Sequence, residues 1–281
     1  MSQYIMKINK ILIPIDFSKC SINALEYALL LSKFINAKMH ILHVHDTSIP
    51  MAKDSIMEMN YEKNVREKFE LLKGNIPFLD HHHYELNIVK GGTIPTILET
   101  VRKQHANLIV MGTQGAGNKV GEWLGSTTYE VMDETSCPVL AIPSGYKFVK
   151  PRKLLFATDY IDTEHSKGLD ILYWFSEYFD SEIHLLNIGE EEDDFTPEQS
   201  QGAEELHDFF EDTPHAFHFL QAEDVEQGLN EFIDLNQIDL LALMPKKHKV
   251  LEKLFQGSLT KVMAHHSKIP LLTFHEEDDS F

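Results

Sequence analysis

The chain has 281 residues, of which 25 are Lys or Arg and 44 are Asp or Glu, so its formal net charge is −19. A hydrophobic fraction of 43% and a charged fraction of 25% exclude collagen, coiled coil and general disorder. No apolar run reaches the ~18 residues that a membrane span requires. No secretory signal is visible, and two cysteines cannot form a disulfide framework. We therefore expect a cytoplasmic protein with no membrane partner.

The acidic residues are concentrated in the second half of the chain. Residues 1–146 carry 14 basic and 15 acidic side chains, whereas residues 147–281 carry 11 and 29. An acidic half of this kind repels nucleic acid backbones, so we expect no nucleic acid partner. The acidic runs at 190–194 and 276–279 are typical of solvated loops and tails.

The first half alternates short apolar runs with helical patterns. The runs that predict strands are 11–15, 39–45, 84–89, 108–112 and 139–142. The patterns that predict helices are 21–35, 58–72, 93–104 and 128–134. This alternation predicts an α/β fold with a doubly wound, parallel, five-stranded sheet flanked by helices. Such sheets bind ligands beyond the carboxyl ends of their strands, where the strand order reverses.

The second half repeats the first. The first apolar run is followed by Asp16 and its counterpart by Asp159, 143 positions later. The glycines of two Gly-Ser pairs, Gly125 and Gly257, lie 132 positions apart, so the second copy is shorter in its middle. A repeat of this length predicts two tandem domains rather than a solenoid. We place them at residues 1–146 and 147–281.

A glycine-rich segment follows the fourth predicted strand. It begins at Gly112 and continues through Gly115 and Gly125 to Ser126 and Thr127, where a helical pattern starts. Glycines let backbone N–H groups approach a ligand, and a helix N-terminus attracts anions, so the segment suits a phosphate. A turn-rich connector with a capped helix is the alternative. The spacing fits neither a P-loop nor a dinucleotide fingerprint.

The spacing Gly112-x2-Gly115-x9-Gly125-Ser126 resembles the nucleotide loop of ATP-binding members of the universal stress protein family. The run from Ile11 to Ser18 and the closing Cys137-Pro138 are also similar to that family. The resemblance covers nearly the whole chain as two copies of a Rossmann-like, UspA-like domain. It implies a stress-response protein whose two copies form a pseudo-dimer, with the closing strands at 139–142 and 271–274 meeting across a pseudo-twofold axis.

The resemblance also implies an ATP site in the first copy. Backbone groups at the end of the first strand and at Val44 would hold the adenine, with Asp16 near the ribose. Gly112 and Gly115 would pass beneath the ribose and phosphates, and the phosphates and water would hold Mg²⁺. ADP, AMP or a cyclic nucleotide are alternatives to ATP. The nucleotide-binding residues implied are Pro14, Ile15, Asp16, Val44, Met111, Gly112, Gly115, Gly125, Ser126 and Thr127.

The second copy departs from this pattern. Met244 stands at the position of Gly112, Lys247 at that of Gly115, and Ala157 at that of Pro14. Bulk at Met244 and the fixed φ of Pro245 oppose close backbone approach, so we expect this copy to lack the standard ATP site. Its lysines either attract another anion or lie in a solvated loop; they are Lys246, Lys247, Lys249 and Lys253.

Three classes of function remain open. The first is a nucleotide-binding signalling or regulatory protein acting on an unidentified protein partner. The second is a slow ATPase, although the sequence offers no catalytic residues: no positioned general base and no Ser-His-Asp order. The third is a nucleotide-free scaffold of the same fold. Since the repeat supplies one pairing internally, both a monomer and a homodimer are compatible with the sequence.

Two further features invite chemical interpretations. The triplet His81-His82-His83 has no carboxylate or cysteine at ligand spacing, so we expect an exposed strand start and no metal site. The same holds for His265-His266. Cys20 lies at the start of a helix, where a buried apolar role is expected rather than a redox role.

Overall fold

The computed structural model describes residues 7–47, 55–79, 82–113, 126–161, 168–189, 195–222, 224–245 and 267–275. The strands of the first half are β1 (Lys10–Pro14), β2 (Lys38–Asp46), β3 (Tyr84–Gly91), β4 (Leu108–Gly112) and β5 (Val139–Ile142). Its helices are α1 (Lys19–Ile35), α2 (Ser55–Lys73), α3 (Thr93–Gln104) and α4 (Ser126–Glu134). All of these elements were expected from the sequence, with ends that differ by about three residues at most.

The described residues of the second half repeat this succession, except that they include no helix between the fourth and fifth strands. Its strands are β6 (Lys153–Ala157), β7 (Glu182–Gly189), β8 (His215–Gln221), β9 (Leu240–Leu243) and β10 (Leu271–Thr273). Its helices are α5 (Leu169–Phe179), α6 (Pro197–Phe209) and α7 (Val225–Asn236). The α/β fold class predicted from the sequence is therefore confirmed.

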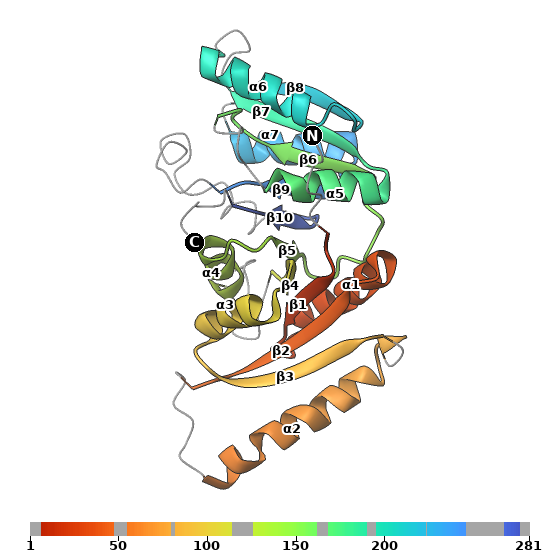
Figure 1. Cartoon of the computed structure of the whole chain (residues 1–281), viewed down its shortest axis with the longest axis vertical. Coiled ribbons are helices and arrows are strands. Elements are labelled where there is room, and N and C mark those ends of the chain that lie inside the picture. The colour runs from red at the N-terminus through yellow and green to blue at the C-terminus, as the bar shows by residue number, and fades with distance from the viewer. Residues whose placement is uncertain are drawn as a thin grey trace.

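All ten strands form one sheet, in the order β3-β2-β1-β4-β5-β10-β9-β6-β7-β8. Within each half, the five strands are parallel to one another. Figure 1 shows the edge strands β3 and β8 toward opposite ends of the long axis, with α2 beyond β3. Read outward from the centre, the second half has the same strand order as the first.

The two halves meet at an antiparallel pair, β5 and β10, in which Leu140 faces Leu272. Both leucines are fully buried. Tyr178 of α5 adds a contact by donating its hydroxyl to the carbonyl of Phe34 at 2.6 Å. The closing strands thus lie side by side, and the apolar core continues from one half into the other.

Helices cover both faces of the sheet, because alternate strand residues point to opposite sides. Ile11 and Ile13 join the core beneath α1, α2, α5 and α6. Leu12, between them, joins the core beneath α3, α4 and α7. A doubly wound sheet buries both faces in this way, and its strands read as nearly continuous apolar runs.

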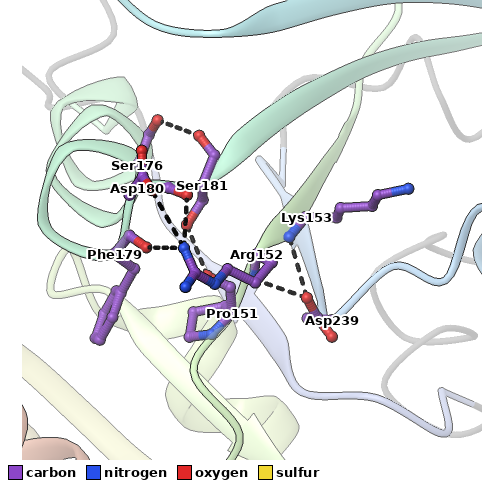
Figure 2. A network of polar contacts seen from close by, with 8 residues as sticks. All are labelled: Pro151, Arg152, Lys153, Ser176, Phe179, Asp180, Ser181 and Asp239. Carbon is purple, nitrogen blue, oxygen red and sulfur yellow. Dashed lines mark hydrogen bonds and ion pairs between the residues drawn. The ribbon is translucent and has the colours of Figure 1, made fainter.

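The Asp239 side chain forms hydrogen bonds with the backbone at the amino end of β6 (Figure 2). Asp239 accepts hydrogen bonds from the backbone N–H groups of Arg152 and Lys153, at 2.7 and 3.0 Å. In the first half, Asn107 accepts from the N–H groups of Asn9 and Lys10, at 3.1 and 3.2 Å. In both halves, therefore, a side-chain oxygen from the loop before the fourth strand accepts hydrogen bonds from the backbone at the start of the central strand.

Candidate functional site

The strand order places the predicted site at the point where successive strands switch from one side of β1 to the other. From β1 the chain proceeds to β2 and β3 on one side, whereas β4 and β5 lie on the other. The carboxyl ends of β1, β2 and β4 are therefore neighbours at a topological switch point, where doubly wound sheets bind their ligands. Pro14, Val44 and Gly112 lie at or near these ends.

The turn from β1 into α1 holds Asp16 at the edge of the sheet. The Asp16 carboxylate is exposed, and its Oδ1 accepts a hydrogen bond from the Ser18 N–H at 2.9 Å. Phe17 between them has a φ of 62°, a left-handed conformation that is uncommon for a non-glycine residue. Ser18 caps α1 by accepting from the Ser21 N–H at 3.2 Å. This turn therefore presents a carboxylate on a fixed backbone.

The end of β2 presents backbone groups toward the same place. The Ile15 N–H donates to the Leu42 carbonyl at 2.8 Å, so Leu42 faces β1. Backbone groups along a strand point alternately to its two neighbours, so Val44 faces the same side. The pairing of β1 with β2 ends at Pro14 opposite Leu42. The N–H and C=O of Val44 therefore point past the end of β1.

The end of β4 lies close to two helices. A Cβ atom at Gly112 would lie 2.6 Å from the carbonyl oxygen of Cys20 in α1, so only glycine allows this approach. The Thr128 hydroxyl of α4 donates to the Gly112 carbonyl at 2.8 Å, which ties the start of α4 to the end of β4. The N–H groups and the dipole at a helix start, here at Ser126 and Thr127, favour an anion.

The exposure of the predicted site residues divides them into two groups. Ile15 and Met111 are 4% and 5% exposed, so only their backbone can contact a ligand. The other described members are exposed or half-buried: Pro14, Asp16, Val44, Gly112, Ser126 and Thr127. Gly115 and Gly125 lie outside the described residues, as do the second-half lysines 246, 247, 249 and 253.

His43 and Tyr61 are part of this region, although the sequence analysis did not select them. His43 Nδ1 bonds the Ile15 carbonyl at 2.8 Å, and its Nε2 bonds the Tyr61 hydroxyl of α2 at 2.9 Å. Burial lowers the pKa of His43, although its bond to Ile15 acts in the opposite direction. Burial raises the pKa of Tyr61. The signal in the sequence was the recurrence of histidine along β2, at His40, His43 and His45.

The structure corrects the interpretation of the histidine triplet. Strand β3 begins at Tyr84, after the histidines, and His81 lies outside the described residues. His82 is half-buried, with its Nε2 2.8 Å from the hydroxyl of buried Ser32, so the expectation of an exposed strand start is wrong for it. The segment just before β3 approaches Ser32 of α1, which supplies this burial.

Several other expectations can be compared with the described residues. Cys20 is buried, in agreement with the apolar role expected for it, and Cys137 is buried with its pKa raised by burial to about 12. Within the described ranges, no three His, Cys, Asp or Glu side chains converge as metal ligands. None of the helices described is long and apolar enough to cross a bilayer.

The second half reproduces the β1–α1 turn. Tyr160 has a φ of 60°, and the Ile161 N–H donates to Asp159 Oδ1 at 3.1 Å. At the position of His43 stands Asn187, whose Nδ2 donates to the Thr158 carbonyl at 3.1 Å. Met244, at the position of Gly112, is buried in the core on the α5 side. Both halves therefore contain this turn, whereas the end of the fourth strand differs between them.

Comparisons with known proteins agree with this geometry. The chain is 29% identical to a universal stress protein of Methanocaldococcus jannaschii over 148 residues, which cover 51% of this chain and 84% of the relative. It is 28% identical to the universal stress protein YxiE of Bacillus subtilis over 149 residues, covering 48% and 98% of the two chains. Each relative therefore matches about half of this chain.

A solved structure shares the fold of the whole chain. A universal stress protein from Archaeoglobus fulgidus superposes with a TM-score of 0.75, covering 97% of this chain and 100% of its own, at 15% identity. The sequence profile of the Universal stress protein family matches residues 7–143. The first half of the chain therefore contains a universal stress protein family domain.

Proposed function

We propose that this protein is a stress-response regulator that binds an adenine nucleotide, ATP in particular, in its first half. The observation that carries the proposal is the open edge of β2 at the switch point, where the Val44 N–H and C=O point past the end of β1. A base with a hydrogen-bond acceptor beside a donor, as in adenine, fits such a backbone edge.

The surroundings of Val44 suit the rest of a nucleotide. The exposed Asp16 carboxylate lies at the end of β1, where it can accept from ribose hydroxyls. The start of α4, fixed to Gly112 through Thr128, offers N–H groups and the Ser126 hydroxyl to phosphates. Mg²⁺ would be held by the phosphates and water, and Gly115 and Gly125 would complete the loop.

We also propose that the chain consists of two tandem universal stress protein domains, residues 1–146 and 147–281, which form an intramolecular pseudo-dimer through β5 and β10. In this account the second domain lacks a standard nucleotide site, because Met244 replaces Gly112. It serves as a structural partner and as a surface for a protein that reads the nucleotide state. The protein acts in the cytoplasm.

Calorimetric titration with Mg-ATP tests the proposed function. The wild type should bind one ATP per chain, and Gly115→Lys, which copies the second half, should abolish binding. Lys247→Gly, the reverse change at the corresponding position, is the matched control and should leave binding unchanged. No binding by the wild type at millimolar ATP would contradict the proposal. Two sites per chain would contradict the assignment of ATP to the first half alone.

A further inference from the structure

We propose that His43 is a positioning residue for base recognition: it occupies the Ile15 carbonyl and so leaves the Val44 N–H available to a ring nitrogen of the base. This inference rests on the proposed function, because it concerns the same site. It assigns to a buried side chain the task of keeping a backbone donor open.

The hydrogen-bond ladder between β1 and β2 ends at Ile15. After the bond from the Ile15 N–H to the Leu42 carbonyl, a parallel ladder would continue with the Val44 N–H donating to the Ile15 carbonyl. Among the described residues, that bond is not formed. The Ile15 carbonyl instead receives His43 Nδ1 at 2.8 Å. The His43 side chain therefore occupies the acceptor that would otherwise receive the next hydrogen bond of the ladder.

The two partners of the His43 ring fix its protonation state. A carbonyl oxygen can only accept, so Nδ1 of His43 carries the hydrogen. The pKa of His43 is lowered by burial, so the ring is neutral at neutral pH and its Nε2 accepts from the Tyr61 hydroxyl at 2.9 Å. Tyr61 in turn stacks on His45, with ring centroids 3.5 Å apart. Helix α2 thereby fixes both the tautomer and the orientation of His43.

The second half of the chain contains an equivalent arrangement. There the Thr158 N–H donates to the Leu186 carbonyl at 3.0 Å, and the Thr158 carbonyl receives Asn187 Nδ2 at 3.1 Å. An asparagine thus supplies the same donor at the same place in the fold. His43→Asn is consequently a substitution that keeps the bond to the Ile15 carbonyl, with Nδ2 in the place of Nδ1.

The chemistry of the open N–H defines the preferred base. A donor requires an acceptor opposite it, and adenine presents an unprotonated N1, whereas N1 of guanine carries a hydrogen. An analogue of ATP in which C–H replaces N1, 1-deaza-ATP, removes that acceptor and little else. The ratio of affinities for ATP and 1-deaza-ATP therefore reports the contact with Val44 directly.

The test is calorimetry of the full chain with Mg-ATP and with Mg-1-deaza-ATP, together with thermal unfolding of each variant without ligand. His43→Phe keeps a ring but removes the donor, so it should weaken ATP binding about three- to tenfold, the worth of one hydrogen bond. Its preference for ATP over 1-deaza-ATP should shrink by a similar factor. His43→Asn should retain the affinity and the preference of the wild type.

A second variant keeps the test decisive if His43→Phe does not fold. His43→Gln places its amide near Tyr61 rather than Ile15, so it should behave as His43→Phe does. Wild-type affinity and wild-type preference in folded His43→Phe or His43→Gln would overturn the inference alone. Failure of the wild type to bind ATP would overturn the proposed function and this inference with it.

Discussion

The turn that follows the first strand has the same backbone in both halves of the molecule, but its side-chain contacts differ between them. In the first half, Phe17 is half-buried and Asp16 is exposed. In the second half, Tyr160 is 2% exposed, and its hydroxyl lies 3.3 Å from the Leu185 carbonyl. Gln199 of α6 also donates to the Asp159 carbonyl at 3.2 Å. The second half therefore buries its turn more deeply, with added contacts from Tyr160 and Gln199, whereas Asp16 of the first half stays exposed.

The comparison shows which features belong to the fold and which distinguish the first half. A side-chain donor within the second strand occurs in both halves, as His43 in β2 and Asn187 in β7. Gly112 does not recur, and its structural reason is the close approach of Cys20 in α1. Helix α5 begins at Leu169, later in its half than α1, which begins at Lys19. Gly112 thus serves the packing of α1 as well as any ligand.

The largest expected effect concerns this glycine. Gly112→Ala should destabilise the protein by about 1–3 kcal/mol, because the added methyl group meets the Cys20 backbone, which cannot move aside without shifting α1. Urea unfolding measures the change. Gly74→Ala is the control, since a Cβ there meets its nearest atom at 3.7 Å, and it should stay within about 0.5 kcal/mol of the wild type. Equal stability of the two variants would contradict this account.

A smaller effect is expected at the start of the central strand, where the second half uses an aspartate and the first half an asparagine as the hydrogen-bond acceptor. Asp239→Ala leaves two N–H groups at the start of β6 without their acceptor and should cost about 1–2 kcal/mol. Asp239→Asn copies Asn107 of the first half and should cost less than half as much. Denaturant titration compares the two. If Asn proved as costly as Ala, the equivalence of these two positions would be refuted.

The smallest effect is a loss of stability in acid. His184 and His218 are 2.9 Å apart through Nδ1 and Nε2, and burial lowers the pKa of each in the folded state. The unfolded chain therefore binds protons more readily, so stability falls as the pH drops below about 6.5. We expect the Tm to decrease between pH 7.5 and pH 5, by about 2–4 °C for each kcal/mol lost.

His218→Phe is the matched variant for the acid effect. Phenylalanine keeps a ring against Phe232, whose centroid lies 5.0 Å from that of His218, but it does not titrate. The decrease in Tm on acidification should be smaller in this variant. An unchanged decrease would show that other groups cause it.

The strands and helices of the first half could be predicted from the sequence because their signals are local. Apolar runs and helical spacing depend on neighbouring residues, and the repeat showed that the second half follows the same plan. The switch point at β1 and β4 then followed from the doubly wound topology. The predicted site residues at Pro14, Val44 and Gly112 accordingly lie at neighbouring strand ends.

Contacts between distant side chains and backbone groups could not be predicted in this way. His43 reaches a carbonyl 28 residues away, and Asn107 reaches N–H groups 97 and 98 residues away. Such bonds depend on strand register and on which side of a strand a residue faces. The burial of His82 against Ser32 likewise depends on how the segment before β3 approaches α1, which no local pattern encodes.

Hydrogen exchange of the Val44 and Ile188 amides, with and without saturating Mg-ATP, tests the central claim most directly. The two residues follow His43 and Asn187 in equivalent strands, so each amide serves as the control for the other. The account predicts that ATP slows exchange at Val44 and leaves Ile188 unchanged. Equal protection at both amides, or no change at Val44 in an ATP-saturated sample, would contradict it.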